Sequence, residues 1–432
     1  MSDTIAAVST GTQVCAIGIV RMSGGKAIEI ADRLFSPVSG RKMADCEDRK
    51  LIYGKLCDEQ GRLLDICLCT ISRAPNSYTG EDTAEFQCHG SPVVLRAVLE
   101  AVFGLSARQA LPGEFTKRAF LNGRMDLSGA EAVADIIDAE TAEAARNAAG
   151  QLGGAISRRI DEIYGTLTDI SSHYHAVLDY PDEDIEDFTL ARYESDIERC
   201  TAVLESLRAS YDSGKLLHSG VPAAIVGRPN AGKSSLLNAV LGYDRAIVTD
   251  IPGTTRDTIE EKLRLGGVLL RLTDTAGIRE TDDEIERMGV TRSRRAMEQA
   301  DLVLAVIDGH REITPEDLEL IKCAERAPHG IVILSKHDLG SLSKMPETTL
   351  PVIEISSVTG EGLDKLEDTV RALFPMPAAP AGEILTNARQ FDAVSRALEA
   401  MKAAGDAMRL GCTPDIVLTE TETAMAALGE LT

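Results

Sequence analysis

The sequence predicts a multidomain fold with an α+β N-terminal domain at residues 1–118, an all-α helical domain formed by residues 119–218 and 376–432, and an α/β domain inserted at residues 219–375. Three observations predict it. Short apolar runs separated by turn residues fill the first part, apolar residues at helical spacing dominate the second, and strand-length apolar runs alternate with helical patterns in the third. A chain of 432 residues allows each domain its own core.

In the N-terminal domain we expect strands at Val14–Arg21, Leu51–Cys57, Leu63–Ile71 and Thr83–Cys88, and a helix at Gly90–Phe103. Cys67 and Cys69 alternate along one strand and therefore share a face. The chain has nine cysteines, an odd number, and no C-x-x-C pair. We therefore favour buried, reduced thiols over a disulfide or metal framework.

In the helical domain we expect helices from Ser128 to about Tyr180, from Leu190 to Leu217, and over residues 383–410 and 414–430. Ser128 followed by Glu131 predicts a capping box, and Thr413 predicts an N-cap with Pro414 at the first helical position. After Ser128, five apolar residues fall on one side of the expected helix, namely Ala130, Val133, Ala134, Ile137 and Ala139.

The inserted domain shows five apolar runs of strand length, at Pro222–Val226, Leu269–Thr273, Leu302–Ile307, Ile331–Leu334 and Val352–Ile355. Helical patterns separate most of them. This order predicts a mostly parallel sheet with helices on both faces.

Charge and composition argue against some classes of protein. The chain has 45 basic and 68 acidic residues, a net charge of −23, which argues against coating nucleic acid through bulk electrostatics. A local basic patch lies within the inserted domain and could be a nucleic-acid contact or a solvated helix face. It contains Arg287, Arg292, Arg294 and Arg295. No signal-like N-terminus or run of ~20 apolar residues is present, so we expect a soluble, cytoplasmic protein.

A phosphate-binding loop is predicted at residues 227–234, whose sequence fits G-x-x-x-x-G-K-S between a strand and a helix. Its backbone N–H groups would point at phosphate oxygens. Lys233 would reach the β- and γ-phosphates, and the Ser234 hydroxyl would bind Mg²⁺. The spacing thus predicts a P-loop nucleotide-binding domain.

Two further segments fit a switch that responds to the γ-phosphate. Asp274 ends a strand and suits a contact to Mg²⁺-bound water, while Gly277 could offer its N–H to the γ-phosphate. Thr255, in the loop between, is the natural second hydroxyl ligand for Mg²⁺.

The base is predicted to be guanine. Asp338, after the fourth strand, can accept two hydrogen bonds from the N1–H and exocyclic amine of guanine, a donor pair that adenine lacks. Ser335 stands where GTPases usually have Asn, so we expect weaker binding of the same base. Ser356, Ser357 and Val358 would cover its other side. These motifs predict a Ras-like G domain.

The residue that orients the attacking water in Ras-like proteins is a Gln after Asp-Thr-Ala-Gly. Here that position is Ile278, which cannot do so. The acidic residues that follow, from Glu280 to Glu286, read on composition as solvated charges. Either another group orients the water, or the protein is a slow switch that needs outside help.

The chain resembles the MnmE (TrmE) family of tRNA modification GTPases over essentially its whole length. The resemblance rests on four strings in the G domain, Gly227–Asn238, Ala246–Asp250, Gly253–Asp257 and Asp274–Gly277. Outside it, the matching strings are Gly80–Asp82, His89–Gly90, Pro112–Phe115, Arg118–Asn122 and Asp126–Leu127.

The resemblance implies a mechanism in which two G domains pair and K⁺ supplies the charge that an arginine finger gives elsewhere. Asn230, Thr249, Ile251 and Thr254 would be the K⁺ ligands, and Glu286 would position the water. The candidate GTP residues are Asn230, Ala231, Gly232, Lys233, Ser234, Ser235, Thr249, Asp250, Ile251, Pro252, Gly253, Thr254, Thr255, Asp274, Thr275, Ala276, Gly277, Ser335, Lys336, His337, Asp338, Ser356, Ser357 and Val358.

The resemblance also implies that the N-terminal domain is folate-binding-like and dimerises. It would hold 5-formyl- or 5,10-methylene-tetrahydrofolate at Arg21, Glu85 and Arg124, although on their own these read as two surface arginines and an ordinary strand residue. The family ends in Cys-x-Gly-Lys, whereas this chain stops at Leu431-Thr432. We therefore expect a truncated chain that keeps GTP hydrolysis and dimerisation.

The implied function is modification of C5 of the wobble uridine of certain tRNAs to (carboxymethyl)aminomethyluridine, as a heterotetramer with the FAD protein MnmG. One alternative is a ribosome-assembly or switch GTPase without folate chemistry, but no second G domain or basic domain is visible. Another is a dynamin-like membrane GTPase, which no basic amphipathic helix supports.

Overall fold

The computed structural model of the chain describes residues 3–11, 13–180, 190–243, 261–272, 299–340, 346–375 and 380–431. It divides into two compact units, Met1–Val133 and Ala134–Leu431. Among the described residues, no helix has the length and apolar character needed to cross a membrane.

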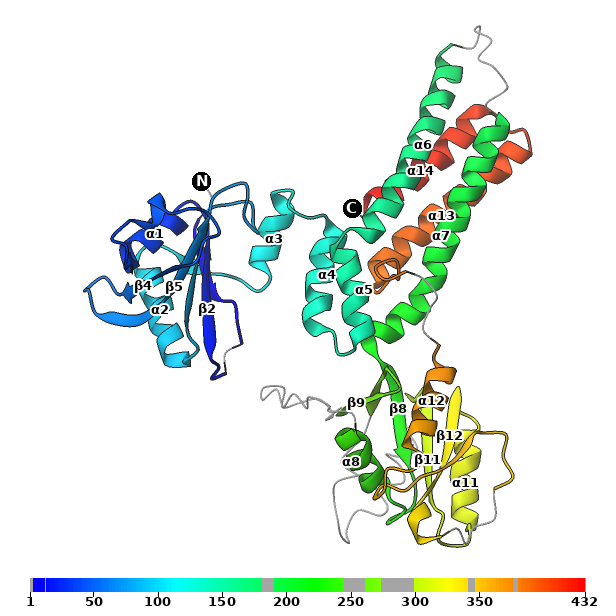
Figure 1. Cartoon of the computed structure of the whole chain (residues 1–432). Helices are drawn as coiled ribbons and strands as arrows, with labels where there is room; N and C mark the ends of the chain where they lie inside the picture. The colour runs from blue at the N-terminus through cyan, green and yellow to red at the C-terminus, as the bar shows by residue number, and fades with distance from the viewer. Residues whose placement is uncertain are drawn as a thin grey trace. The chain divides into compact units, whose positions relative to one another are not determined.

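The first unit is built on a seven-stranded sheet with the order β3-β4-β5-β6-β2-β1-β7. Its elements are β1 (Ile5–Val8), β2 (Ile17–Ser23), α1 (Ala27–Leu34), β3 (Phe35–Pro37), η1 (Met43–Asp45), β4 (Ile52–Cys57), β5 (Leu63–Ser72), β6 (Thr83–His89), α2 (Pro92–Gly104), β7 (Arg108–Gln109) and α3 (Glu114–Leu121). Helices α1 and α2 bury their apolar faces in one core with the sheet (Figure 1).

The predicted α+β character of this unit is confirmed, with corrections. The strand expected at Val14–Arg21 begins only at Ile17, and Val14 is 84% exposed. The elements β1, β3, β7, α1 and α3 were not predicted. Each has eight residues or fewer, too short for a period to stand out.

The helical part of the second unit contains α5 (Ala142–Leu152), α6 (Ala155–Asp179), α7 (Leu190–Ser219), α13 (Ala388–Arg409) and α14 (Pro414–Gly429), while α4 (Leu127–Asp138) crosses the boundary between the units. One mostly aliphatic core joins α6, α7, α13 and α14. Figure 1 shows these long helices side by side, with α7 and α13, remote in sequence, packed together.

The single helix expected from Ser128 to Tyr180 is wrong, because it consists of three helices. The Thr141 hydroxyl accepts from the Ala144 N–H and starts α5, and Gly154, at φ 76°, allows the chain to turn into α6. The capping box at Ser128 is also wrong, since Ser128 lies inside α4 and the Asp126 carboxylate accepts from the Gly129 N–H instead. On the predicted apolar side, Ile137 is 76% exposed. The start of α14 at Pro414 is confirmed, although the Thr413 side chain forms no capping bond.

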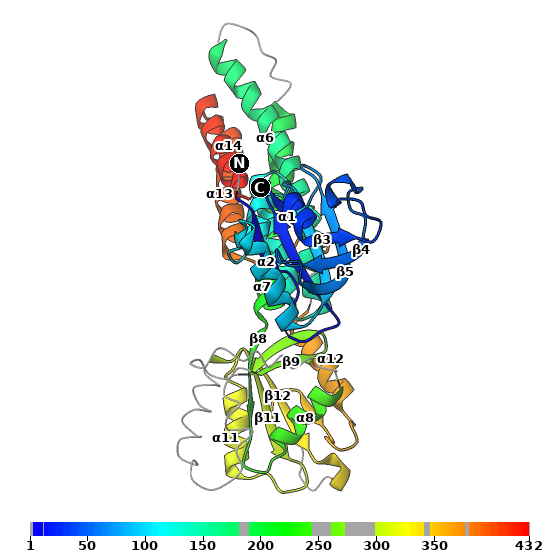
Figure 2. The ribbon, with the colours of Figure 1, turned by 90° about the vertical axis from the view of Figure 1, so that its left-hand side faces the viewer.

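The second sheet has six strands in the order β13-β12-β11-β8-β10-β9, and all pairs are parallel except β10 with β9. Its elements are β8 (Val221–Val226), α8 (Lys233–Tyr243), β9 (Glu261–Leu265), β10 (Val268–Leu272), β11 (Leu302–Asp308), α11 (Pro315–Ala324), β12 (His329–Ser335), η3 (His337–Leu339), β13 (Val352–Glu354) and α12 (Leu363–Leu373). Figure 2 shows α8 and α12 on one face and α11 on the other, which agrees with separate cores on the two faces.

All five strands expected here are confirmed, and the edge strand β9 was missed. The β9–β10 hairpin contacts the helical part twice. Lys262 of β9 forms an ion pair with Glu140, and the Arg271 guanidinium of β10 donates to the Ser219 carbonyl at the end of α7, at 3.2 Å.

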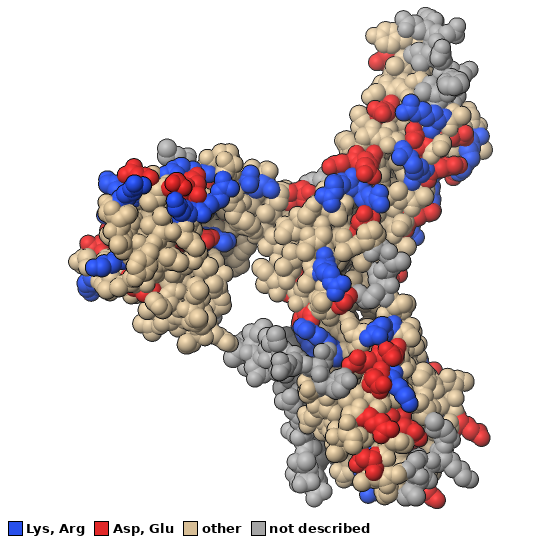
Figure 3. All heavy atoms as spheres, in the orientation of Figure 1, with Lys and Arg blue, Asp and Glu red and all other residues tan. Residues whose placement is uncertain are grey.

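Charged side chains of both signs lie on the face of the molecule drawn in Figure 3. Acidic and basic side chains are intermixed there. No broad basic area is visible on the described part of this face.

Candidate functional site

The phosphate-loop sequence forms the turn between β8 and α8. Gly227 has no room for a side chain, because a Cβ there would lie 2.4 Å from the Val306 carbonyl oxygen of β11. Asn230 and Gly232 adopt φ of 62° and 96°, the left-handed region that lets the backbone curl. The glycine spacing in the sequence therefore has a direct steric cause.

Lys233 begins α8 and points back into this loop. Its Nζ donates to the Gly227 carbonyl at 2.8 Å and the Arg228 carbonyl at 2.9 Å. Burial lowers the pKa of Lys233. Ser234 and Ser235 follow in the first turn of α8, the end of the helix toward which its backbone N–H groups point. A loop with a half-buried ammonium at a helix N-terminus suits a phosphate group.

Arg228 ties the phosphate loop to the start of α11. Its guanidinium donates to the Thr314 hydroxyl at 3.0 Å and lies 2.9 Å from the Glu316 carboxylate. Thr314 caps α11 in a capping box with Asp317. No role for Arg228 could be predicted from the sequence, although the Thr-Pro-x-Asp motif that caps α11 is visible in it.

The residues expected at the base come together from two loops. The Ser356 hydroxyl donates to the Asp338 carboxylate at 2.7 Å, which joins the loop after β13 to the one after β12. The His337 N–H donates to the Ile355 carbonyl at 3.2 Å and supports the same junction. Asp338 itself is exposed, and so is Val358.

Ser335 faces the phosphate loop from the end of β12. Its side chain is buried, and Oγ lies 2.5 Å from the Ala231 carbonyl oxygen and 3.0 Å from that of Ile307. The hydroxyl has one proton and therefore donates to one of these two acceptors at a time. From the sequence, Ser335 was predicted only as a weaker partner for the base, and its contact with the phosphate loop was not predicted.

Asp308, at the end of β11, holds the side chain of Lys336. The Lys336 Nζ lies 2.7 Å from Asp308 Oδ2, and Lys336 has φ of 61°. Burial raises the pKa of Asp308, but the hydrogen bonds from Lys336 and from the His310 N–H outweigh this and leave that pKa below its usual range. Sequence reasoning missed Asp308, because an acid at a strand end carries no motif of its own.

Several candidate residues lie outside the described residues. These are the expected catalytic and switch positions Thr249, Asp250, Ile251, Pro252, Gly253, Thr254, Thr255, Asp274, Thr275, Ala276, Gly277 and Glu286, together with Ile278 and the arginines from Arg287 to Arg295. Their roles stay predictions.

In the first unit, Arg21 and Glu85 form an ion pair. They lie opposite each other on β2 and β6, with Nε 2.6 Å from Oε1, and both are half-buried. The Arg21 guanidinium also lies over the rings of Tyr78 and Phe115, 5.5 and 5.8 Å from their centroids. The carboxylate, the guanidinium and the two rings make a polar spot with apolar walls.

Arg124 lies near Gly80. A Cβ on Gly80 would approach the Arg124 side chain to 3.3 Å, and Gly80 has φ of 77°. Arg124 is exposed. No contact of its side chain with Arg21 or Glu85 is recorded within the described part of the chain.

Arg118 is the centre of an ion network that sequence reasoning did not identify. Its guanidinium lies 2.9 Å from Glu81, 3.0 Å from Glu114 and 2.7 Å from Asp3. Glu114 also pairs with Arg108 at 2.6 Å. Three segments that matched the family as separate strings therefore meet at one buried cation, and the Asn122 amide adds a bond to the Thr79 carbonyl at 2.7 Å.

Comparison with known proteins identifies two family models along the chain. The family described as "GTP-binding protein TrmE N-terminus" matches residues 4–124, and "MnmE helical domain" matches residues 127–432. The tRNA modification GTPase MnmE of Clostridioides difficile (strain 630) is 41% identical over 94% of this chain and 89% of its own length. The protein of the same name from Roseiflexus sp. (strain RS-1) is 42% identical over 100% and 95%.

Solved structures match part of the chain. The G domain of the T. maritima FeoB iron transporter is 28% identical over 35% of this chain and 98% of its own, with a TM-score of 0.26. Aquifex aeolicus Era bound to GDP·AlF4⁻ is 29% identical over 44% of this chain and 66% of its own, with a TM-score of 0.27.

Proposed function

The chain belongs to the MnmE family of tRNA modification GTPases, and we propose that it uses K⁺-dependent GTP hydrolysis to modify the wobble uridine of tRNA in the cytoplasm. The family expected from the sequence motifs is confirmed. One observation carries the proposal: a chain about two-fifths identical to tRNA modification GTPases over nearly its full length folds its phosphate loop around Lys233.

For the nucleotide, the chain's own residues divide into two groups. Lys233 and the N–H groups at the start of α8 would hold the β- and γ-phosphates. Asp338, oriented by Ser356, would accept from the N1–H and amine of guanine. The Ser234 hydroxyl, in the first turn of α8, suits Mg²⁺, with Thr255 as its second hydroxyl partner.

For hydrolysis, we propose that Glu286 orients the attacking water and that Gly277 donates its N–H to the γ-phosphate. Asn230, Thr249, Ile251 and Thr254 would hold K⁺, which supplies positive charge near the bridging oxygen. Asn230 is the described member of this set, and it lies within the phosphate loop with φ of 62°. Two G domains would pair across the nucleotides.

For the one-carbon unit, we propose that the first unit binds a tetrahydrofolate at Arg21, Glu85 and Arg124. The spot formed by Glu85, Arg21 and the rings of Tyr78 and Phe115 fits a flat, polar heterocycle, because the carboxylate accepts from amine N–H groups and aromatic faces cover an apolar ring. The folate would supply the one-carbon unit, while dimerisation and an FAD-containing MnmG partner would complete the enzyme. The intermixed surface charge favours a partner that provides much of the tRNA-binding surface.

The test is steady-state GTP hydrolysis in KCl against NaCl at equal ionic strength. We expect strong activation in KCl only, lost in Glu286→Ala and kept in Glu284→Ala, a matched acid in the same segment. Equal, slow rates in both salts would overturn the K⁺ mechanism and favour the switch GTPase alternative. Folate binding, measured separately with Glu85→Ala as the control, would distinguish the family chemistry from that alternative.

A further inference from the structure

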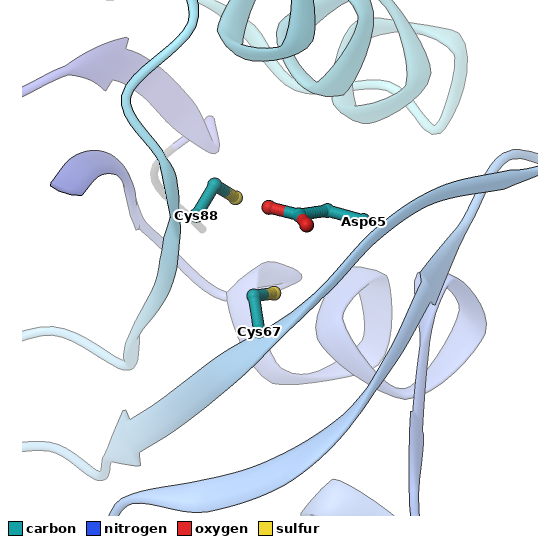
Figure 4. Close-up of side chains that lie close together, drawn as sticks. All are labelled: Asp65, Cys67 and Cys88. Carbon is teal, nitrogen blue, oxygen red and sulfur yellow. The ribbon is translucent and has the colours of Figure 1, made fainter. Parts of the chain in front are cut away.

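Three side chains of metal-binding type lie together at one end of the first sheet. Asp65 and Cys67 belong to β5, and Cys88 is the second-to-last residue of β6. Their ligand atoms all lie within 4.8 Å of one another. Figure 4 shows the carboxylate and the two thiols pointing toward a common centre. None of the three belongs to the Arg21–Glu85 pair or the Arg118 network.

Strand pairing brings these residues together. β5 and β6 are antiparallel, and Leu68 pairs with Gln87, so the next position along the ladder sets Cys67 opposite Cys88. Asp65 precedes Cys67 by two residues and faces the same side of the sheet. Both cysteines are buried.

The Asp65 carboxylate is mostly buried and has no permanent cation beside it. Its side chain is 10% exposed, and its one recorded ion pair is with His89, which carries charge only when protonated. Across the described residues, no Lys or Arg lies within ion-pair distance of it. Its oxygens accept from the Ile66 N–H, the His89 N–H and the His89 ring, at 2.7, 2.8 and 2.8 Å.

Those three bonds leave about one lone-pair direction on the carboxylate, since it offers about four. A buried carboxylate without a cation destabilises a fold. Two thiols and one carboxylate, aimed at one centre, would satisfy this charge if they bound a divalent cation.

We propose that Asp65, Cys67 and Cys88 form a structural site for a zinc-class divalent cation. Two sulfur ligands and one oxygen ligand suit Zn²⁺, with Zn–S near ~2.3 Å and Zn–O near ~2.1 Å. A tetrahedral site with these bonds sets ligand atoms about 3.3–3.8 Å apart, so the side chains would draw together by about 1 Å. Water takes the fourth position.

Binding would displace protons from the thiols. Each thiol that binds Zn²⁺ releases its proton to solvent, and the site with two thiolates and one carboxylate carries a net charge of −1. The cation would clamp β5 to β6 just before the chain enters α2.

The experiment is a Co²⁺ titration of the whole chain, because Co²⁺ replaces Zn²⁺ and absorbs light. We expect one equivalent to give a thiolate-to-cobalt charge-transfer band and the strong visible bands of a tetrahedral site, both removed by added Zn²⁺. Cys67→Ala and Cys88→Ala should abolish the bands. Cys69→Ala should keep them, since Cys69 is equally buried on the same strand and face but lies outside the cluster.

Absence of the bands in the parent chain, or equal bands in all three cysteine variants, would overturn the proposal. Asp65→Asn covers the case in which a cysteine variant does not fold, because it keeps both thiols and an amide oxygen. We expect it to weaken Co²⁺ binding by about tenfold or more. Unchanged affinity in Asp65→Asn would overturn the role of the carboxylate and, with it, the three-residue site.

Discussion

Replacing Ser335 with alanine should loosen the phosphate loop and weaken guanine-nucleotide binding. The Ser335 hydroxyl is buried between the carbonyl oxygens of Ala231, in the loop, and Ile307, at the end of β11. Alanine removes the one proton that these acceptors share and adds no substitute. Water has little access to the gap, because Ser335 is only 2% exposed.

The magnitude follows from the value of one buried hydrogen bond. A net bond is worth about 0.5–1.5 kcal/mol, and a buried acceptor left without a donor raises the cost, so we expect a loss of about 1–2 kcal/mol. If the nucleotide-free loop becomes disordered without this hydrogen bond, GDP binding must supply the free energy that orders it again. The affinity for GDP then falls by about 5- to 30-fold. If the bond persists equally with and without nucleotide, the loss appears as stability instead.

Two measurements separate these outcomes. Titration with a fluorescent GDP analogue gives the affinity, and chemical unfolding with and without GDP identifies the transition that belongs to the nucleotide-binding part. Thr369→Ala is the control, since this exposed hydroxyl donates to the Lys365 carbonyl at 2.7 Å, away from the loop, and its loss should cost less than about 0.5 kcal/mol. If Ser335→Ala kept both the affinity and the unfolding midpoint, the donor role assigned to Ser335 would be wrong. Ser335→Asn, in the same titration, tests whether serine weakens base binding.

Three further predictions concern charges. Arg118→Leu should destabilise the first unit by about 3 kcal/mol or more, because it takes the guanidinium away from the largely buried Glu81 and from the Asp3–Glu114 network, in which Glu114 keeps Arg108. Arg118→Lys should cost less, and amide exchange in β2 and α3 measures both. The Arg108 hydrogen bond holds the pKa of Glu114 at about 2, below its ordinary value of 4.5, so the stability from this carboxylate is complete above pH 4.5 and is lost as the pH falls toward 2. Acid unfolding of Glu114→Gln should therefore be flatter over that range, and an unchanged profile would contradict the assignment. Asp308→Asn should weaken GDP binding several-fold, about 1 kcal/mol, because it frees the Lys336 side chain. The preference for guanine over adenine should not change, since Asp338 stays intact, and competition between GTP and ATP measures that preference.

The parts of the fold that the sequence predicted share a simple cause. Val221–Val226, Leu302–Asp308 and His329–Ser335 are buried on both faces, so they read as unbroken apolar runs bounded by turns. β9 was missed because its sequence, Glu-Lys-Leu-Arg-Leu, places charges on an edge strand. The three helices between Leu127 and Asp179 merged into one prediction, since neither the Thr141 cap that starts α5 nor the left-handed Gly154 before α6 disturbs the apolar period.

The candidate site divides in a similar way. Lys233, Asp338 and the glycines of the phosphate loop could be predicted, because their spacing along the chain is fixed by the ligand they face. Asp308, Arg118 and the Asp65 cluster could not, since their partners come from other strands and no local spacing marks them. Cys67 alone reads as a core thiol, and the register of β5 on β6 adds Cys88.

The β9–β10 hairpin has one mechanical consequence. Glu261 and Leu272 are paired at its open end, so the chain segments that carry Thr255 and Asp274 join the hairpin at adjacent points. The same ribbon is fastened to the helical part through Lys262 and Arg271. A displacement of either segment would therefore move the same hairpin. Through Lys262 and Arg271, the helical part would receive both displacements at one place.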